Sequence, residues 1–317
     1  MLSYYAFPPE GQGMKPLVTV GICVRNGENM LKNAVNSIIN QDFPEKQLQL
    51  IFVDDGSEDS TPKIISDYVS RLGDQAKSFR TAWKGLGHAR NQVVDNADGE
   101  YIMFVDADQI LTSNYLKIQL ETLEKYPEVG ITAGVFKTVP GNLILNLEVI
   151  PYIVNQRNYL KPKNFIWKTD KLIGTGGTTF RIKALRQVNG FDERIKGSGE
   201  DTDLVLRIKK AGWLIRPNMA ELYELHGGLS KPKDLWKKYF WYGYGCQRTV
   251  RQTRESFSIP RMTPIAGLVA GVFYSFQAYK FLYKKIVFLL PFHFGLKLTA
   301  WTFGFMKGQI QDSTTRL

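Results

Sequence analysis

The sequence has very little cysteine. Only two cysteines, Cys23 and Cys246, occur in its 317 residues, and they lie far apart in the chain. Cys23 also sits within an apolar run, Leu17–Val24. A scaffold held together by disulfides is therefore excluded, and the composition fits a reducing compartment.

Signals that would assign the chain to several large protein classes are also lacking. Residues 1–16 contain no basic segment followed by an apolar run, so we expect an irregular N-terminal arm rather than a signal peptide. No internal repeat or low-complexity segment occurs. With 44% hydrophobic and 22% charged residues, the composition is that of neither a disordered chain nor a polytopic membrane protein.

Acidic residues are scarce in one part of the chain only. Residues 231–317 hold 14 basic and 3 acidic side chains, whereas residues 1–230 hold 27 of each, so the formal net charge of +11 belongs to the C-terminal part. A chain that binds nucleic acid through general basicity is therefore disfavoured, and we expect no nucleic-acid partner. The neutral part, residues 1–230, is long enough to bury one hydrophobic core.

From residue 17 onwards, strand-like and helix-like segments alternate. Short apolar runs predict strands over 17–24, 48–53, 101–105 and 129–135, and helical spacing predicts helices over 29–40, 60–72, 86–96 and 113–126. Helices are also expected over 143–157 and 202–211, the latter with Asp201 or Thr202 as a possible N-cap. This order predicts an α/β fold with a mainly parallel central sheet, and ligands of such sheets bind beyond the carboxyl ends of the strands.

Pairs of carboxylates follow two of the predicted strands. Asp106 and Asp108 flank Ala107 just after the apolar run 101–105. Two carboxylates at this spacing on a turn can converge on Mg²⁺ or Mn²⁺, which prefer oxygen ligands and often share them with a substrate phosphate. Asp54 and Asp55 close the strand at 48–53, where a carboxylate can accept hydrogen bonds from a base or a ribose hydroxyl. Each pair has a simpler interpretation as a polar turn.

Two further segments combine glycine with charged residues before a helix. In Gly85–Asn91, backbone N–H groups at the helix start favour an anion, and Arg90 can reach a phosphate. The segment lacks the ending of a P-loop and the spacing of a dinucleotide fingerprint. Glu200 and Asp201 precede the helix at 202–211, where a carboxylate can act as a general base or simply favour the helix dipole.

The order of these motifs carries more information than any one of them. Strand-Asp-Asp-Gly-Ser, Gly-x-x-x-Ala-Arg-Asn, strand-Asp-Ala-Asp, Gly174-Thr-Gly-Gly177, Gly190-Phe-Asp-Glu193 and Glu200-Asp-x-Asp-Leu204 follow one another. This series resembles the inverting family 2 glycosyltransferases, over roughly residues 16–226. The resemblance implies a GT-A fold, a nucleotide-diphospho-sugar donor and a divalent metal, Mn²⁺ or Mg²⁺.

The resemblance also implies roles for individual residues. Asp54 would contact the nucleotide base with Asp55 nearby, Arg90 would lie near the phosphates, and Asp106 would touch the ribose and the metal. Asp201 would be the catalytic base, and Glu200 would help to position the acceptor. The remaining implied positions are Asp108 as the main metal ligand, His226 as a further metal ligand, and Gly176 and Gly177 beneath the sugar and acceptor.

The chain departs from the family pattern in two places. Cys23-Val24-Arg25-Asn26 stands where family members often have Pro-x-Tyr-Asn, so Arg25 replaces an aromatic residue and can meet a phosphate or a carboxylate. The Gln-x-x-Arg-Trp signature of processive polysaccharide synthases is absent, and Gln247–Arg251 echoes it only in part. A processive polymerase with a transport channel is therefore disfavoured.

The C-terminal part is basic, aromatic and apolar. Residues 262–279 carry no charge, and residues 286–306 are interrupted only by Lys297, with a kink expected at Pro291. Phe, Trp and Tyr mixed with Lys and Arg suit a lipid interface and anionic headgroups, although a buried helical hairpin is the alternative. We therefore expect four parts: an arm (1–16), a catalytic domain (17–230), a basic amphipathic segment (231–261) and two membrane-associated helices with a tail (262–317).

Together these features predict a metal-dependent glycosyltransferase at the cell membrane, with its catalytic domain on the cytoplasmic face. It would move a sugar from a UDP- or GDP-sugar to a hydroxyl of a lipid-linked saccharide or polysaccharide precursor, and residues 231–317 would contact membrane lipids. The alternatives are a polyprenyl-phosphate hexose synthase, whose acceptor is a phosphate, and a non-catalytic module recruited to the membrane.

Overall fold

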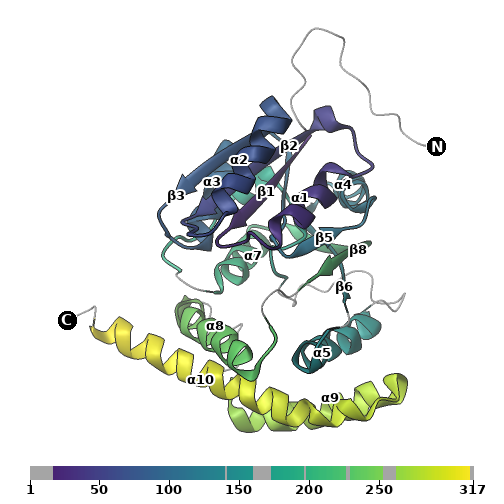
Figure 1. The fold of residues 1–317 in the computed structure, drawn as a ribbon, viewed down its shortest axis with the longest axis vertical. Helices are drawn as coiled ribbons and strands as arrows, with labels where there is room; N and C mark the ends of the chain where they lie inside the picture. The colour runs from purple at the N-terminus through teal and green to yellow at the C-terminus, as the bar shows by residue number, and fades with distance from the viewer. Residues whose placement is uncertain are drawn as a thin grey trace.

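The computed structural model describes residues 17–139, 141–159, 173–195, 198–225, 229–252 and 262–314. An α/β domain lies above a layer of helices from the C-terminal part of the chain (Figure 1). The predicted N-terminal arm, 1–16, lies outside the described residues.

The α/β domain is built on one eight-stranded sheet with the order β3-β2-β1-β4-β7-β6-β8-β5. Four neighbouring pairs are parallel and three are antiparallel, so the sheet is mixed, with parallel pairs in the majority. The strands are β1 (Val18–Val24), β2 (Leu48–Asp55), β3 (Ala76–Thr81), β4 (Tyr101–Phe104), β5 (Gln109–Leu111), β6 (Val129–Thr138), β7 (Thr178–Arg181) and β8 (Leu214–Glu224).

Helices cover both faces of this sheet. One face packs against α1 (Leu31–Ile39), α2 (Thr61–Leu72) and α4 (Tyr115–Lys125), and the other against α3 (Leu86–Asn96), α6 (Ile182–Gln187) and α7 (Glu200–Lys210). β2 is buried along its whole length because Leu50 and Phe52 enter the first core and Ile51 and Val53 the second. A continuous apolar run is the pattern of a strand buried on both faces, so the predicted α/β layers are confirmed.

Local signals explain where two helices begin. Ser60 is the N-cap residue of α2, but Asp59 Oδ1 accepts the hydrogen bond from the Thr61 N–H at 3.0 Å. The helix expected from 202 begins instead at Glu200, because Gly199 at its N-cap adopts a left-handed φ of 105°. Glycine tolerates this conformation without strain. Glu200 and Asp201 therefore belong to the first turn of α7.

The C-terminal helices form a second layer beneath the α/β domain. They are α8 (Pro232–Gln252), α9 (Pro264–Leu282) and α10 (Leu290–Thr314), with α5 (Leu143–Tyr159) beside them. The expected kink at Pro291 is wrong, because a 3-10 turn (Lys285–Leu289) precedes α10 and Pro291 lies in the first turn of α10, where proline is tolerated. Two of the helices, Pro264–Leu282 and a segment over Lys285–Ile310, are long and apolar enough to cross a membrane.

A buried ionic cluster joins three of these helices. Glu148 on α5 accepts a hydrogen bond from the Tyr239 hydroxyl on α8, and its Oε2 lies 2.8 Å from His293 Nε2 and 2.9 Å from Lys297 Nζ on α10. Burial by itself would raise the pKa of Glu148, but His293, Lys297 and Tyr239 outweigh that effect and hold the pKa well below its ordinary value. The carboxylate is therefore charged and fixes α8 and α10 against α5.

Replacing Glu148 by Gln should lower the free energy of unfolding by about 3–5 kcal/mol, because it leaves a buried lysine without its partner charge. Glu148 has a depressed pKa, so its stabilisation is present above the unfolded value of about 4.3 and is lost as the pH falls below it. The difference between wild type and variant should shrink on acidification. Urea unfolding in mild detergent at several pH values measures both effects.

The matched control is Glu121→Gln on the exposed face of α4, which should change the stability by less than about 0.5 kcal/mol. Equal stability of the Glu148 and Glu121 variants at neutral pH would contradict the account of the cluster.

Candidate functional site

The candidate site is a cavity of ≈ 550 Å³ between the α/β domain and the C-terminal helices. Its α/β wall comes from the end of β4, from the loop before β7 and from the first turn of α7. The opposite wall consists of aromatic and apolar side chains of the C-terminal part, namely Tyr239, Trp241, Tyr242, Cys246, Met262 and Trp301.

A buried arginine organises the polar wall. Arg90 on α3 is 3% exposed, and its guanidinium lies 2.6 Å from Glu200 Oε1 and 3.5 Å from Asp106 Oδ1. The rings of Phe104 and Phe191 lie 5.8 and 5.6 Å from the same guanidinium, a distance at which a cation is attracted to an aromatic face. Arg90 thus joins three separate segments, the start of α3, the turn after β4 and the start of α7.

The two acidic residues of α7 have different surroundings. Glu200 is 4% exposed; burial raises its pKa to about 7, Arg90 opposes the rise and Asp201 adds to it. Asp201 is half-buried and lines the cavity, and its Oδ1 accepts a hydrogen bond from the Thr202 N–H at 2.7 Å. Its Oδ2 would be 3.5 Å from a Cβ added at Gly174 across the cavity. Asp201 is the carboxylate that can meet a bound molecule, whereas Glu200 is engaged by Arg90.

Gly176 lines the cavity, and Gly177 follows it in the chain. A Cβ added at Gly176 would lie 2.3 Å from Asp106 Oδ2 and 2.4 Å from Gln109 Nε2, so both of these side chains would have to move to admit it. Gly177 has a left-handed φ of 66°, and its N–H donates to the Phe104 carbonyl at 2.8 Å. The left-handed backbone favours glycine at position 177.

The oxygen ligands expected for a metal lie near one another at the end of β4. Asp106 lines the cavity with a side chain that is 43% exposed, and Asp108 follows it on the turn into β5. Pairing of β5 with β8 brings Glu224 into the same cavity, and the Asp108 carbonyl accepts a hydrogen bond from the Leu225 N–H at 2.8 Å. Within the described parts of the chain, no three His, Cys, Asp or Glu side chains are close enough to hold a metal. His226, the third predicted ligand, lies outside the described residues.

The predicted nucleotide residues of β2 lie beside the cavity and are engaged by the protein. Asp54 Oδ1 accepts a hydrogen bond from the Ser57 N–H at 2.8 Å, and its Oδ2 lies 3.1 Å from Arg80 Nε. Asp55 accepts hydrogen bonds from the N–H groups of Lys84 and Gly85 at 2.9 and 3.1 Å. Asp55 therefore fixes the loop that leads into α3 and Arg90. The contact of Asp54 with a nucleotide base stays a prediction.

Arg25 meets a carboxylate, one of the two partners that the sequence allowed. Its guanidinium lies 3.5 Å from Glu58 and 5.3 Å from the centre of the Trp83 ring. Trp83 is 51% exposed, and its ring centre is 6.4 Å from that of Trp241 on α8. The departure from the family pattern at Arg25 thus belongs to an aromatic bridge from the α/β domain to the C-terminal helices.

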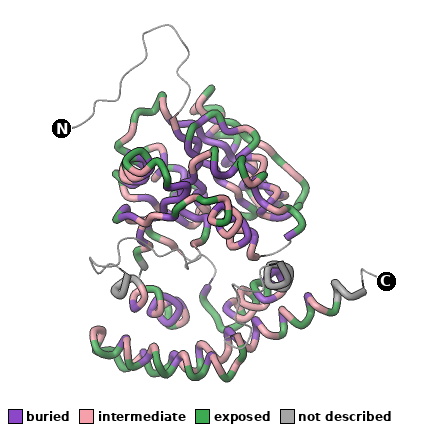
Figure 2. Tube along the Cα trace, turned by 180° about the vertical axis from the view of Figure 1, so that it is seen from behind, coloured by how far each residue is buried: buried purple, intermediate pink, exposed green. Residues whose placement is uncertain are grey.

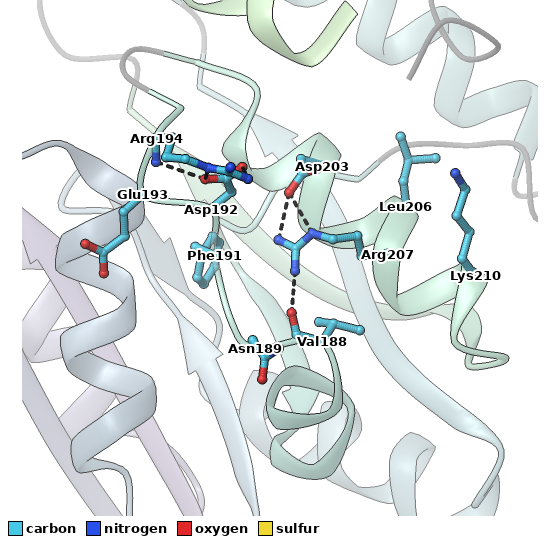
Figure 3. A pocket seen from close by; sticks show the side chains of 10 residues that line it. All are labelled: Val188, Asn189, Phe191, Asp192, Glu193, Arg194, Asp203, Leu206, Arg207 and Lys210. Atoms are coloured by element: carbon cyan, nitrogen blue, oxygen red, sulfur yellow. Dashed lines mark hydrogen bonds and ion pairs between the residues drawn. The ribbon is translucent and has the colours of Figure 1, made fainter. Parts of the chain in front are cut away.

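A second cavity, of ≈ 450 Å³, lies between the segment Gly190-Phe-Asp-Glu193 and α7 (Figure 3). Four of its charged residues form two pairs: Arg194 contacts Asp192 at 2.8 Å, and Arg207 contacts Asp203 at 2.7 Å and the Val188 carbonyl at 2.6 Å. These contacts hold the segment that places Phe191 beside Arg90. This motif therefore supports the first cavity rather than forming a separate polar site.

Sequence reasoning missed several residues of the cavity. Gln109 is 2% exposed, accepts a hydrogen bond from the Asp106 N–H at 3.1 Å, and follows Asp106 by one turn, a spacing that could have drawn attention to it. No local pattern marked Tyr239, Trp241 and Trp301 as cavity residues, because they come from helices far along the chain.

Comparison with known proteins agrees with the fold. The model of the family described as Glycosyl transferase family 2 matches residues 19–188. Poly(ribitol-phosphate) β-N-acetylglucosaminyltransferase TarS of Staphylococcus aureus is 28% identical over 180 residues, which are 52% of this chain and 31% of that protein. A probable glycosyltransferase of Bacillus subtilis, YdaM, is 27% identical over 215 residues, 63% of this chain and 48% of the relative. The chain thus spans less than half the length of these curated relatives.

Solved structures show the same fold. The mannosyltransferase PcManGT of Pyrobaculum calidifontis, in complex with GDP-Man and Mn²⁺, superposes with a TM-score of 0.63 at 16% identity, over 93% of this chain and 88% of that one. Residues 1–349 of S. aureus TarS in complex with UDP superpose with a TM-score of 0.52 at 17% identity, over 93% and 91%. With the family model matched over more than half of its length, the chain belongs to glycosyl transferase family 2 and is a glycosyltransferase with the GT-A fold.

Proposed function

We propose that this glycosyltransferase moves a sugar from a UDP- or GDP-sugar, with inversion, to a hydroxyl of a lipid-linked saccharide or polysaccharide precursor. The reaction takes place at the membrane, with the catalytic domain on the cytoplasmic face. The observation that carries the proposal is the cavity in which Asp201 and Asp106 stand on the polar wall and aromatic side chains form the opposite wall.

Asp201 is the proposed base. The acceptor hydroxyl loses its proton to the Asp201 carboxylate as its oxygen bonds to the anomeric carbon of the donor sugar. The bond from that carbon to the diphosphate oxygen breaks at the same time, and the nucleoside diphosphate leaves with the electron pair. A positioned carboxylate of this kind contributes about 10²–10⁴-fold to a rate. Arg90 holds Glu200 at the cavity wall, so Asp201 is the carboxylate that meets the hydroxyl.

The residues at the end of β4 fit a divalent metal. Although 43% of its side chain is exposed, partial desolvation in the cavity raises the pKa of Asp106; Arg90 opposes this, and Glu224 and Asp201 add to it. Carboxylates crowded in this way favour a bound cation, and Mn²⁺ and Mg²⁺ prefer such oxygen ligands. Asp106 and Asp108 would hold the metal, with His226 as a further ligand, and the metal would neutralise charge on the departing diphosphate. The Mn²⁺ in the neighbouring mannosyltransferase supports this choice.

The charge of the cavity favours a hydroxyl over a phosphate as acceptor. Of the described residues that line it, four carry a carboxyl group (Asp106, Glu200, Asp201 and Glu224) and one, Arg90, carries a guanidinium that already binds two carboxylates. A phosphate that is itself the attacking group, as in a polyprenyl phosphate, would have to stand directly beside these carboxylates. A sugar can instead stack on the aromatic wall and offer hydroxyls to the carboxylates. The S. aureus relative, named for poly(ribitol-phosphate), supports an acceptor that bears hydroxyls.

The first test replaces Asp201 by Asn. We expect a fall of about 10²–10⁴-fold in kcat for transfer, because the amide cannot take the proton, with donor binding retained. A screen of UDP- and GDP-sugars with a lipid-linked saccharide acceptor, read as release of nucleoside diphosphate, measures both.

Asp67→Asn, the same change on the exposed face of α2, is the control and should retain full activity. Efficient transfer to polyprenyl phosphate alone, undiminished in the Asp201 variant, would overturn the choice of acceptor. The absence of both donor binding and donor hydrolysis in the wild type would favour a non-catalytic module instead.

The second test concerns the metal. Asp108→Ala should remove the Mn²⁺ or Mg²⁺ dependence of donor binding and reduce transfer by at least about 10-fold. Loss of a residue that only hydrogen-bonds to a metal ligand already lowers metal affinity or activity by that factor. Calorimetric titration of the donor with and without Mn²⁺ measures the binding. Asp95→Ala on the exposed end of α3 is the control. Unchanged metal dependence in the Asp108 variant would contradict the assignment.

The third test separates the aromatic wall from the rest of α8. Trp241→Ala should raise the KM for the saccharide acceptor about three- to tenfold, since an aromatic contact is worth about 0.5–1.5 kcal/mol, and should leave the KM for the donor unchanged. Trp236→Ala, on the same helix but with its ring centre 6.0 Å from that of Phe303 of α10, is the matched control. An equal effect of both variants on the acceptor KM would show a general disturbance of α8 rather than loss of an acceptor contact.

A further inference from the structure

The outward faces of α9 and α10 are apolar along their length. Neighbouring turns of α9 expose side chains spaced three or four residues apart, so they share one face: Ile265 75%, Val269 66%, Phe273 59% and Phe276 60%. On α10, Phe303 54%, Met306 54% and Ile310 64% are spaced in the same way, and Phe292 73% lies three turns earlier on that face. In Figure 2 these two helices form the edge of the molecule that is farthest from the sheet.

The inward faces of the same helices are tightly packed and hold their polar groups. His293 and Lys297 of α10 turn inward to Glu148, and the Ser275 hydroxyl of α9 donates to backbone carbonyls. Gly271 packs so closely on α10 that an added Cβ would lie 2.4 Å from the Pro291 Cα. The two helices are therefore one plate whose inner side is buried and holds the polar groups, and whose outer side is apolar and exposed. We call this pair, Pro264–Leu282 and Leu290–Thr314, the apolar plate.

The position of α8 opposes a spanning arrangement. α10 crosses α8 in close contact, because an added Cβ at Gly304 would lie 1.9 Å from the Phe240 carbonyl oxygen. α8 bears the exposed Lys237 one turn from this crossing. A bilayer enclosing the whole of α10 would also enclose that charge, which costs several kcal/mol near the bilayer centre.

The charged residues of the apolar plate suit an anionic lipid surface. No Asp or Glu occurs between residues 256 and 311. Lys280, Lys284 and Lys285 are exposed around the turn between the two helices, and Lys307 is exposed near the far end of α10. Basic residues around an apolar face suit anionic lipid headgroups, each contributing roughly 1 kcal/mol.

We propose that the apolar plate lies in the plane of the membrane and inserts its outer face into one leaflet of an anionic bilayer without crossing it. The proposal rests on the proposed function, because a lipid-linked acceptor requires the cavity to stand at a membrane surface. It adds that the protein is monotopic, with its helices in one leaflet only, and it gives the distance between the active site and the apolar layer of the membrane.

The same helix supplies the membrane face and the cavity wall. Trp301 lines the cavity, and Phe303, two residues on, is exposed on the outer side of α10. Residues two apart point to nearly opposite sides of a helix, whose diameter with side chains is about 10 Å. The reacting hydroxyl therefore lies about 10 Å above the apolar layer. A saccharide carried on a lipid phosphate reaches that height, whereas the phosphate itself stays with the headgroups.

The first experiment uses the double variant Phe273→Glu/Phe276→Glu in the full chain. Flotation with sealed vesicles of phosphatidylcholine and phosphatidylglycerol should recover the wild type, and the variant should bind at least about tenfold more weakly because two aromatic side chains leave the lipid. Leu214→Glu/Met219→Glu, two exposed apolar residues of β8, is the matched control and should float like the wild type.

Activity and oligomeric state keep the outcomes apart. Donor hydrolysis in detergent should be the same in the wild type and in the Phe273/Phe276 variant. A wild type that does not hydrolyse any donor would contradict the proposed function but not the position of the apolar plate. Flotation of the variant like the wild type would overturn the proposal. So would a wild type that does not float but sediments as a dimer broken by the two substitutions, since a second copy would then cover the face.

The second experiment decides between lying in and crossing the membrane. It uses Lys284→Cys, at the turn of the apolar plate, and Lys117→Cys, on α4 of the catalytic domain. Each variant is labelled with an impermeant maleimide, once in right-side-out and once in inside-out membrane vesicles. The wild type, with Cys23 and Cys246, gives the background. We expect both added cysteines to react from the same side. Labelling of position 284 only from the opposite side would show a spanning hairpin and overturn the proposal.

Discussion

The buried contact between Arg90 and Glu200 is the interaction on which the site depends. Burying two charges costs several kcal/mol each unless the geometry is close and the remaining polar atoms are satisfied. Here the two groups are 2.6 Å apart, Asp106 lies near the same guanidinium, and two aromatic rings flank it. The contact ties α3 and α7 to the end of β4, three elements that are separated by up to 110 residues. It thereby keeps Asp201 and Asp106 on one wall of the same cavity.

The cavity also needs the C-terminal helices. The α/β domain supplies its carboxylates, and α8 and α10 supply the aromatic side chains that face them. Glu148 holds this second wall together through Tyr239, His293 and Lys297. A buried carboxylate therefore joins separate helices in the C-terminal layer, as Glu200 joins separate elements in the α/β domain. In the proposed arrangement the same layer carries the membrane face. Chemistry and location are thus joined by one thin layer of helices.

Much of the fold could be predicted because its central strands are apolar runs. β1, β2 and β4 are buried on both faces and read clearly as strands. β3 and β7 were not assigned, since Ala76–Thr81 is a polar edge strand and Thr178–Arg181 is only four residues long. The antiparallel pairing of β7 with β4 and β6, which makes the sheet mixed, depends on contacts between distant segments. No local pattern encodes such pairing.

The sequence by itself determined the family and the residues of the polar wall. Gly176 and Arg90 stand in motifs whose order is specific, and each is required by a close local contact. Only the tertiary structure decided that Asp54 meets Arg80, that Asp55 meets the loop before α3, and that Trp241 and Asp201 line one cavity. It also decided that the apolar residues of α9 share an outward face. The physical reason is the same in each case. The chemical type of a side chain is read from its own position in the sequence. The residues that it contacts, and whether it is buried or exposed, depend on segments that are distant in the chain.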